Sequence, residues 1–454
     1  MKLSPQLKSL SLVLAGKRLL LSEIPYQTTL IQEAVQKGYV QQMSGLQTSG
    51  SRYSCVRCGN KDKSLLGSHH CARCQTICHY CRHCLMLGKI SSCQPLHVWA
   101  GPPIPQPIIK NSLRWKGELS LGQKVASEAV VEAVEQKSFL LVWAVCGAGK
   151  TEVLFHGLER AFATGKRALL ATPRTDVVKE LYPRLQASFP DISMTALYGG
   201  SKDRHANAQL VLATTHQTMR FYKAFDVVIV DEVDAFPFSY DKSLQYAVEQ
   251  AKKPTSSTIL LSATPSSTLL KTSHLQVVKI PKRYHGFPLP VPCFKWVGNW
   301  QKRLKKNKLP SVVLDWIQTY EAKKKPLLLF VPSVSILTQV SEALQNQSIK
   351  HASVHAADPK RHEAVQAFRN RHVSIMVTTT ILERGVTFAD VQVAVLGAEN
   401  DVFTEAALVQ IAGRVGRKKE TPTGEVIFFH YGVTKAMKAA RRHIEQMNEE
   451  GGRA

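Results

Sequence analysis

The sequence predicts an α/β protein in which two tandem lobes, each built on a parallel sheet, follow a small cysteine-rich module. Short apolar runs alternate with helical stretches from about residue 118 to 288, and the alternation restarts after a proline-rich stretch at 281–292. Continuous apolar runs are typical of strands buried on both faces, so each lobe is expected to be a parallel sheet covered by helices. The cysteines are the third observation, because eight of the ten lie between residues 55 and 93.

The chain is predicted to divide into five parts. These are an N-terminal segment (1–50), a cysteine-rich module (51–98), a proline-rich linker (99–117), a first lobe (118–288) and a second lobe (289–454). Leu10–Leu21 is expected to be an amphipathic element packed on its neighbour, and the prolines of 101–107 predict a semi-rigid spacer. The runs expected to be strands are Phe139–Val145, Ala168–Ala171, Leu210–Ala213, Val227–Val230, Ile259–Leu261, Leu327–Val331, Ser374–Val377, Val393–Leu396 and Val426–Phe429.

The charge of the chain indicates a polyanionic partner. Lysine plus arginine is 59 and aspartate plus glutamate is 34, which leaves a net charge of +25. Cations that neutralise phosphates release counterions and so strengthen binding to nucleic acid; a basic protein without a specific partner is the alternative. No apolar run approaches the ~20 residues that span a bilayer, and Met1–Gln6 lacks the pattern of a secretory signal. A cytosolic chain is expected, and its basic surface could hold it against anionic lipid.

One segment has the composition of a phosphate-binding loop. Ala144–Thr151 reads AVCGAGKT; an apolar run precedes it, and a helix is expected over 152–163. In a strand–loop–helix unit, backbone N–H groups face the phosphates, Lys150 reaches the β and γ oxygens, and Thr151 ligates Mg²⁺. The loop residues expected to cradle the nucleotide are Gly147, Ala148 and Gly149. Ala144 stands where the usual pattern has glycine, so a chance loop is the alternative.

An acidic quartet, Asp231–Asp234, follows the apolar run Val227–Val230. At the carboxyl end of a buried strand, Asp231 can hold Mg²⁺ and Glu232 can orient or deprotonate an attacking water. Alone, such a quartet is more often a solvated turn. Its position downstream of the loop makes it the expected partner of Lys150 and Thr151.

Near the end of the chain, Gln410–Arg417 reads QIAGRVGR. Arg414 and Arg417 are expected on one helix, where a spacing of three residues places them on the same face. Guanidinium groups suit the charge that develops in phosphoryl transfer; a basic helix face is the alternative. A chain with both the loop and these arginines is predicted to be a nucleotide-driven motor.

The order of these motifs resembles that of superfamily-two helicases and translocases, whose two lobes are RecA-like. The resemblance implies that Gln123 reads adenine and that Ser262-Ala263-Thr264 couples hydrolysis to motion. It also implies that Thr378–Thr387, with Gly385 among the nucleotide contacts, touches both nucleotide and nucleic acid. The segments that resemble strand-contacting motifs of the first lobe are Ala171–Arg174 and Ala213–Gln217.

The match is closer to one family. Asp231–Pro237, Pro281–Gly286 and Ile381–Phe388 look like segments of the ComFA competence proteins. That resemblance covers nearly all of residues 51–450. It implies that ATP hydrolysis drives single-stranded DNA inward through the channel protein ComEC, with ComFC and DprA as further partners. The replication-restart helicase PriA is similar by pattern, but its cysteine pairs lie within the helicase region, whereas here they precede it.

The cysteines predict structural zinc, because a C-x₂-C pair lets both thiolates reach one tetrahedral ion. The pairs are Cys55/Cys58, Cys71/Cys74 and Cys81/Cys84, with Cys78 and Cys93 beside them. The family resemblance implies one site from Cys55, Cys58, Cys81 and Cys84 and a second from Cys71, Cys74, Cys78 and Cys93. Spacing alone equally allows 55/58 to pair with 71/74. Cys146 and Cys293 are expected to be buried thiols. Four histidines of the module are less favoured as zinc ligands, namely His69, His70, His79 and His83.

Two basic stretches with aromatic residues are candidate DNA contacts, namely Lys282–His285 and Trp296–Lys308. Bases can stack on aromatic faces while cations follow the backbone; a solvated helix with half-buried tryptophans is the alternative. The favoured function is a DNA-stimulated ATPase that translocates on single strands. Two alternatives stay open at this point: a PriA-like helicase of replication restart or repair, and a non-enzymatic zinc-bearing DNA adaptor.

Overall fold

The computed structural model describes residues 3–50, 52–201 and 203–453. The predicted boundary at residue 51 and the first two residues of the predicted start lie outside the described residues. The chain forms two compact units. The first contains residues up to 118, 125–142 and 153–278, and the second contains residues 119–124, 143–152 and 279 onward.

The N-terminal part is a small α/β arrangement. α1 (Pro5–Leu14) begins where the Ser4 hydroxyl accepts a hydrogen bond from the Leu7 N–H, and α2 is Thr28–Gln36. β8 (Leu96–Trp99) lies between β1 (Leu19–Leu20) and β2 (Val40–Met43), antiparallel to both. The expected element at Leu10–Leu21 is therefore wrong as a single unit, because the helix ends at Leu14 and Gly16, at φ +66°, turns the chain into β1.

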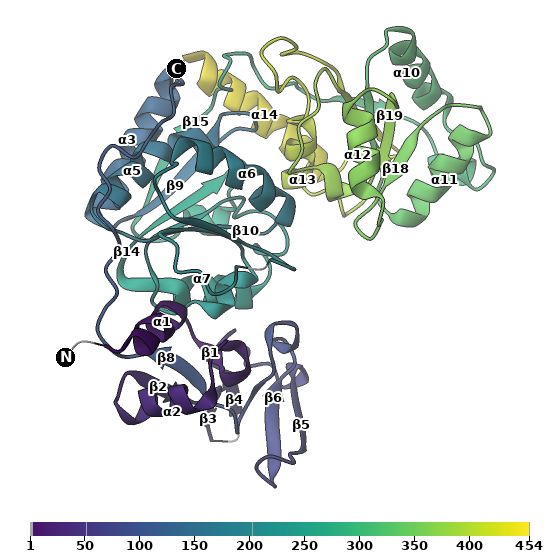
Figure 1. The fold of residues 1–454 in the computed structure, drawn as a ribbon. Coiled ribbons are helices and arrows are strands. Elements are labelled where there is room, and N and C mark those ends of the chain that lie inside the picture. Colours follow the sequence, from purple (N-terminus) through teal and green to yellow (C-terminus); the bar gives the residue numbers. More distant parts are fainter. Residues whose placement is uncertain (1–2, 51, 202, 454) are drawn as a thin grey trace. The chain divides into compact units, whose positions relative to one another are not determined.

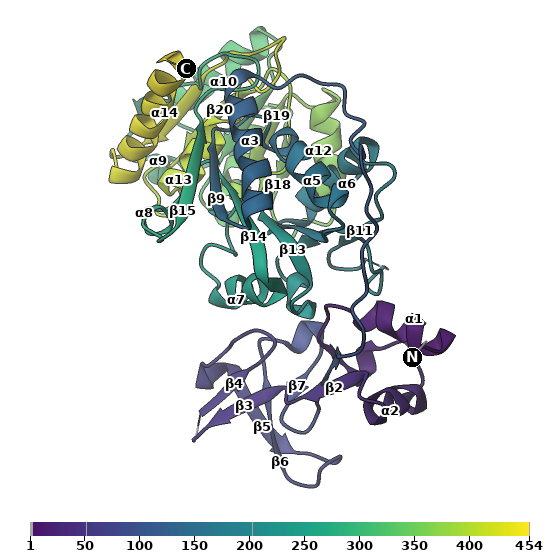
Figure 2. The same ribbon diagram turned by 90° about the vertical axis from the view of Figure 1, so that its left-hand side faces the viewer.

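Short antiparallel strands carry the cysteines. β3 (Leu46–Ser49) pairs with β4 (Arg52–Cys55), and β6 (Ile77–Cys81) lies between β5 (Leu66–His70) and β7 (Ile90–Ser91). Both the N-terminal part and this cysteine region belong to the first compact unit, beside α7 (Lys242–Ala251) of the first lobe (Figure 1, Figure 2).

The N-terminal part and the cysteine region both pack closely on the first lobe. A Cβ at Gly59 would lie 2.7 Å from the Tyr246 ring, and the Tyr246 hydroxyl donates to the Val56 carbonyl at 3.3 Å. A Cβ at Gly16 would lie 2.6 Å from Cβ of Ala224. The linker is also fastened, since the Gln209 side chain donates to the Pro107 carbonyl at 2.9 Å.

The first lobe has a seven-stranded sheet in the order β11-β12-β10-β13-β14-β9-β15. The pairs β11–β12, β12–β10, β10–β13 and β13–β14 are parallel, and α6 packs on β10–β12. The strands are β9 Phe139–Ala144, β10 Ala168–Thr172, β11 Met194–Leu197, β12 Leu210–Thr214, β13 Phe225–Val230, β14 Lys252–Ser262 and β15 Leu275–Ile280. The remaining helices are α3 Leu121–Gln136, α4 Lys150–Val153, α5 Phe155–Ala163, α6 Thr175–Ser188 and α8 Ser267–Leu270.

The second lobe has a six-stranded parallel sheet in the order β16-β21-β20-β17-β19-β18. α11 lies against β19 and α12 against β18 (Figure 1). The strands are β16 Cys293–Trp296, β17 Leu327–Phe330, β18 Ala352–Val354, β19 Ile375–Thr378, β20 Gln392–Leu396 and β21 Val426–His430. The helices are α9 Trp300–Leu304, α10 Ser311–Ala322, α11 Val334–Gln345, α12 Arg361–Arg369, α13 Glu405–Ala412 and α14 Lys435–Arg453.

The predicted fold class is confirmed, since two parallel-sheet lobes follow a module with two four-cysteine clusters. Each apolar run expected to be a strand coincides with one, although Val145, Ser374 and Val331 lie one residue outside β9, β19 and β17. Among the described strands of the two lobes, β11, β15, β16 and β18 were not predicted, because these strands are short or mixed in polarity, and the strands β1–β8 before the lobes were not predicted either. The helix expected over 152–163 is two helices, α4 and α5, which meet at Leu154. In the described part of the chain, no helix is long and apolar enough to cross a membrane.

Candidate functional site

The phosphate loop begins where β9 ends. Gly147 and Gly149 have φ values of +80° and +71°, a region that glycine enters without steric cost. Ala144 is the last residue of β9, and its backbone is that of an ordinary strand. Alanine is therefore adequate where the usual pattern has glycine. Lys150 and Thr151 begin α4, so backbone N–H groups of the loop lead into a helix start, as the sequence predicted.

Gln123 lies against the loop. Its side-chain N–H₂ donates to the Ala148 carbonyl at 2.8 Å, and its side-chain oxygen accepts from the Ser120 N–H at 2.8 Å. A Cβ at Gly149 would lie 2.4 Å from the same side-chain nitrogen. Gln123 thus braces the loop in this structure, and its predicted contact with adenine stays a prediction.

Within the second unit, the loop also packs on α13. The Cys146 thiol donates to the Gln410 side-chain oxygen at 3.1 Å, and a Cβ at Gly413 would lie 2.4 Å from the Cys146 Cβ. Cys146 is buried, as expected. Only glycine at 413 leaves room for this approach of the loop to the end of the helix.

The two candidate arginines do not lie on a helix, contrary to the prediction. α13 ends at Ala412, Gly413 caps it, and Gly416 at φ +67° turns the chain. Arg414 is 1% exposed; its Nε donates to the Glu383 carbonyl at 2.8 Å and its Nη1 donates to the Val386 carbonyl.

Arg417 differs from Arg414 in its surroundings. It is half-buried, and its Nε donates to the Gly413 carbonyl at 3.0 Å. Arg414 is therefore placed to hold the segment that contains Gly385, at φ +77°, whereas Arg417 is the more accessible of the two guanidinium groups.

Arg283 is a buried cation of the second unit that the sequence suggested as a DNA contact. Its guanidinium donates to the carbonyls of Val415 at 2.9 Å and Pro422 at 2.8 Å, and burial lowers its pKa to about 10. These bonds hold the turn that carries Arg417. Arg283 is 3% exposed, so the expectation that it follows a DNA backbone is wrong.

The acidic segment follows β13 in the first unit. Glu232 has a φ of +53°, a left-handed conformation that costs a non-glycine residue about 1–3 kcal/mol. Its N–H donates to Asp231 Oδ1 at 2.8 Å. Its Oε2 is buried and has no hydrogen-bond partner among the described residues. Glu232 therefore combines a strained backbone with a buried carboxylate oxygen that has no protein partner among the described residues. These properties suit a residue that binds a water molecule.

Asp234 links the acidic segment to the carboxyl end of β14 and the residues after it. One carboxylate oxygen accepts from the Ser262 hydroxyl at 2.7 Å and the other from the Thr264 hydroxyl at 2.6 Å. The sequence predicted a coupling role for Ser262–Thr264 but did not assign Asp234 as its partner. The sequence does contain a sign of this role, because Asp234 is an acidic residue of the quartet that the magnesium and water assignments leave unused.

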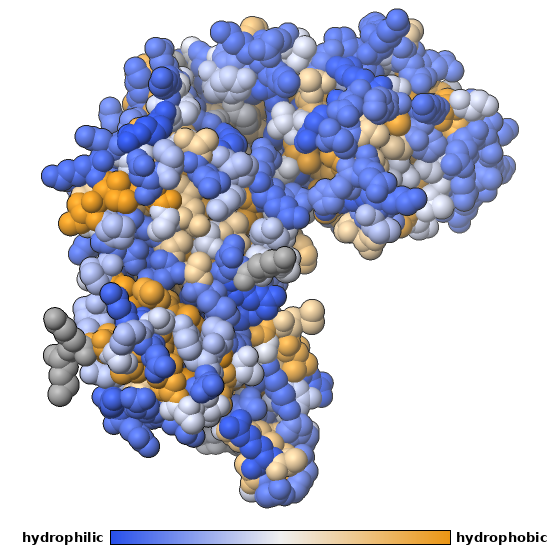
Figure 3. All heavy atoms as spheres, viewed as in Figure 1, coloured by the Kyte–Doolittle hydropathy of each residue, from blue (hydrophilic) through white to orange (hydrophobic). Residues whose placement is uncertain are grey.

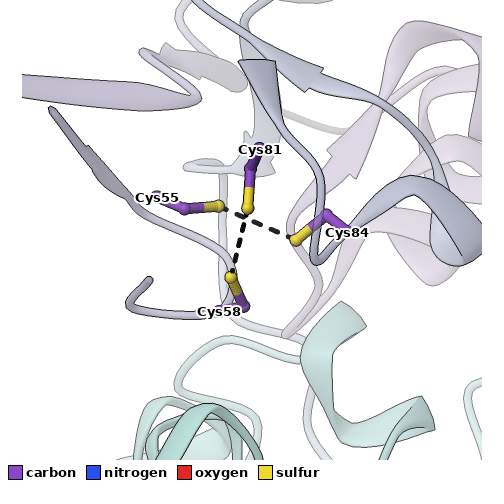
Figure 4. Close-up of side chains that lie close together, drawn as sticks. All are labelled: Cys55, Cys58, Cys81 and Cys84. Carbon is purple, nitrogen blue, oxygen red and sulfur yellow. Dashed lines mark hydrogen bonds between the residues drawn. The ribbon is translucent and has the colours of Figure 1, made fainter. Parts of the chain in front are cut away.

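Four buried cysteines form the first cluster (Figure 4). Cys55 and Cys58 come from the end of β4 and the turn after it, and Cys81 and Cys84 come from the end of β6 and the turn after it. Their sulfur atoms lie within 4.8 Å of one another, with Cys55–Cys84 at 3.7 Å and Cys58–Cys81 at 3.6 Å. Zinc–sulfur bonds of ~2.3 Å in a tetrahedron place sulfurs about 3.8 Å apart. The donor set and its spacing fit zinc.

The second cluster consists of Cys71, Cys74, Cys78 and Cys93, again with all sulfurs within 4.8 Å. Cys71 and Cys93 sulfurs are 3.8 Å apart, which also fits a tetrahedral ion. The two clusters have the grouping that the family resemblance implied, rather than the alternative that spacing allowed. Cys78 is buried and the other three are partly exposed.

Cys293 and two of the histidines lie outside the two cysteine clusters. Cys293 is exposed, contrary to the prediction, because β16 lies at the edge of its sheet. His83 Nε2 is 3.5 Å from Asp241 Oδ2, and His79 packs on the Tyr53 ring at 4.3 Å between centroids. Neither histidine belongs to a cysteine cluster.

The basic stretch Trp296–Lys308 contains both buried and exposed side chains. Trp300 is 1% exposed and donates from Nε1 to Glu399 at 2.7 Å, whereas Trp296 is 65% exposed. Lys302, Arg303 and Lys305 are exposed. The visible surface over α10–α12 of the same lobe is mostly hydrophilic (Figure 3). Trp296 and these cations remain available to a polyanion.

A group of buried charges that no sequence pattern indicates joins the cysteine region to the first lobe. Glu23 accepts from Arg57, which lies between Cys55 and Cys58, and from Arg220 at the end of η4 (Gln217–Arg220). The Arg57 side chain is 0% exposed, and its Nη2 also donates to the Arg18 carbonyl at 3.0 Å. The first cysteine cluster is thereby tied to the segment that follows Ala213–Gln217.

Family models match three parts of the chain. They describe the competence protein ComFA N-terminal domain over residues 3–98, the res subunit of type III restriction enzymes over 116–267, and the helicase conserved C-terminal domain over 305–419. The solved structure of S. cerevisiae Dbp5 bound to RNA and ADP BeF₃ matches with a TM-score of 0.53 at 13% identity, covering 72% of this chain and 91% of that one. That likeness shows the fold alone.

Two curated relatives match at much higher identity. The chain is 46% identical to competence protein ComFA of Bacillus subtilis over 446 residues, which is 97% of this chain and 96% of the relative. It is 38% identical to ComFA of Streptococcus pneumoniae over 379 residues, 82% of this chain and 87% of the relative. The chain therefore belongs to the ComFA family of competence proteins, with the two lobes of a superfamily-two helicase-type ATPase.

Proposed function

We propose that this protein is an ATP-dependent translocase on single-stranded DNA that drives DNA into the cytosol during natural transformation. The observation that carries the proposal is the pair of hydrogen bonds from Ser262 and Thr264 to Asp234, two residues after Glu232. Through these bonds, a movement of the segment that carries Glu232 during hydrolysis would also move Ser262 and Thr264. A motor requires such a coupling, and an ATPase without mechanical output does not.

Each candidate residue has a distinct task in this proposal. Lys150 holds the β and γ phosphates, with the backbone of Gly147–Gly149 around them, and Thr151 and Asp231 are the magnesium ligands. Glu232 orients and deprotonates the attacking water through its buried Oε2. Arg417 stabilises the charge that develops on the transferred phosphoryl group. Arg414 keeps the segment around Gly385 in place.

The cysteine clusters would hold zinc as structural ions. Bound zinc supplies folding energy to a segment too short and polar to fold around a hydrophobic core. The first cluster, together with Arg57 and Glu23, fixes the N-terminal part on the first lobe.

The partners are proposed from the family. Single-stranded DNA is the track, the channel ComEC at the inner face of the membrane is the site of action, and ComFC and DprA are further candidates. A position in the cytosol against that membrane face is consistent with the net charge of +25, since anionic lipid attracts basic surfaces.

The test is ATP turnover of the full chain with and without single-stranded DNA. We expect the DNA to stimulate turnover and Glu232→Gln to lower the stimulated rate by ~10²–10⁴-fold, because the general base is lost. Glu249→Gln, which changes an exposed carboxylate on α7, is the matched control and should behave as the parent. Displacement of streptavidin from end-biotinylated strands then distinguishes translocation from turnover alone. A parent without turnover would reject the motor and favour the zinc-bearing adaptor.

A further inference from the structure

Two aromatic side chains directly after the acidic segment project into solvent. Phe236 is 73% exposed and Tyr240 is 74% exposed, and their ring centroids are 6.4 Å apart at an interplanar angle of 50°. Large aromatic rings normally bury most of their surface, so a neighbouring pair this exposed marks a binding surface better than a packing one.

The exposure of these rings is built into the loop. Ala235 and Phe238 are buried at 2% and 6% exposure and anchor the loop to the lobe. The Ser239 N–H donates to the Ala235 carbonyl at 3.1 Å, and the Gln245 side chain donates to the Phe238 carbonyl at 2.9 Å. Ala235 and Phe238 thus hold the loop on the lobe while Phe236 and Tyr240 of the same loop face solvent.

The loop lies at the edge of the sheet where ligands of open α/β folds bind. It follows the carboxyl end of β13, and the segments after β10 and β12, which are parallel to it in the same sheet, leave from the same edge. η4 (Gln217–Arg220), in the segment after β12, packs on α7, which begins two residues after Tyr240. The loop that carries the aromatic pair therefore leads into a helix that lies beside the end of the Ala213–Gln217 segment within the first unit.

The charges beside the pair leave a cation available to a polyanion. Lys242, two residues after Tyr240, is exposed. The flanking carboxylates are engaged, because Asp234 accepts from the Ser262 and Thr264 hydroxyls and Asp241 Oδ1 accepts from the Ser243 N–H at 2.8 Å. An exposed aromatic pair with a lysine beside it matches a strand whose bases stack and whose phosphates need neutralisation.

We propose that Phe236 and Tyr240 form a stacking platform for the bases of a single-stranded nucleic acid. This site deepens the proposed function and rests on it, since it assigns where the strand is sensed. The platform begins two residues after Asp234, which binds Ser262 and Thr264. A base that stacks on the rings therefore contacts the same segment that carries Glu232.

The test separates bases from phosphates. Binding of an oligothymidylate and of an abasic strand of equal length is measured by fluorescence anisotropy, at one salt concentration, for the full chain loaded with zinc. Replacing both rings by leucine (Phe236→Leu with Tyr240→Leu) keeps apolar surface but removes the aromatic faces. We expect this variant to bind oligothymidylate at least about tenfold more weakly than the parent and the abasic strand with parental affinity. The aromatic exchange Phe236→Tyr with Tyr240→Phe should restore the affinity for bases.

Three outcomes would overturn the platform. Leucine variants that bind oligothymidylate as the parent does would leave the rings as a contact for a protein partner. Equal weakening on both strands would assign the effect to phosphates or to the fold, which the thermal unfolding midpoint checks. Failure of the aromatic exchange to restore binding would exclude stacking. A parent that binds strands without any stimulation of turnover would instead reject the proposed motor and leave the platform testable by the same titration.

Discussion

Single residues decide the shape of the phosphate loop. Gly149 has φ +71°, and a Cβ there would lie 2.4 Å from the side-chain nitrogen of Gln123. Gly149→Ala should therefore strain the backbone by ~1–3 kcal/mol and displace the brace from Gln123. We expect at least a tenfold loss of nucleotide affinity, measured with a fluorescent ATP analogue. Gly432→Ala is the control, since a Cβ there meets nothing within 4 Å; equal behaviour of the two variants would contradict the argument.

Lysine substitutions of Arg414 and Arg417 are predicted to have different effects on stability and on turnover. Arg414 bonds two carbonyls with one guanidinium, which a lysine ammonium cannot match, so Arg414→Lys should lower the thermal unfolding midpoint. Arg417→Lys should keep the midpoint near that of the parent and lower turnover on the order of 10³-fold. Differential scanning fluorimetry and steady-state turnover check both. Two variants with the same pair of effects would show that the assignment of roles is wrong.

At the scale of elements, the junction between the cysteine region and the first lobe contains one carboxylate that two buried arginines share. Glu23→Ala would leave Arg57 and Arg220 as buried cations without their shared partner, which typically costs about 3–5 kcal/mol. Chemical denaturation of the full chain measures the loss. Glu33→Ala removes an exposed i,i+4 pair with Lys37, which solvent screens, so it should change stability far less. Similar costs for both variants would mean that Glu23 does not hold the junction.

Lys17 at the same junction predicts a dependence of stability on pH. Burial, and then the charges of Arg167 and Arg220, lower its pKa from 10.5 to about 7. Below about pH 7, the folded and unfolded chains both carry the proton and the full burial cost opposes folding. As pH rises from about 7 towards 10.5, only the folded chain gives up the proton, so this residue's contribution to stability improves.

Replacing Lys17 by methionine should remove that dependence. We expect Lys17→Met to raise the unfolding midpoint more at about pH 6 than at about pH 9, because the cost it abolishes is largest at low pH. Lys8→Met, which changes an exposed lysine on α1, is the control and should give no pH-dependent difference. A gain that is the same at both pH values would show that Lys17 does not titrate as proposed.

For the whole molecule, the two cysteine clusters predict the metal content. Two equivalents of zinc per chain are expected by elemental analysis, falling to one in Cys58→Ser and to one in Cys74→Ser. A chelator should remove the ion of the second cluster first, because three of its four cysteines are partly exposed whereas the first cluster is buried. One equivalent in the parent would reject the two-site proposal.

The sequence by itself determined the class of fold and the family. Continuous apolar runs such as Val227–Val230 and Leu327–Val331 become central parallel strands because burial on both faces leaves them no other stable state. The phosphate loop, the acidic quartet and the cysteine pairs were also readable, since each chemistry depends on residues that are near neighbours in the chain.

Only the tertiary structure decided which distant residues act together. It separated Arg414 from Arg417, buried Arg283 and Trp300, and exposed Cys293. It also brought Glu23 between Arg57 and Arg220 and left Phe236 and Tyr240 in solvent. The physical reason is that burial and ion pairing depend on what packs against a side chain, and local sequence patterns do not contain that information.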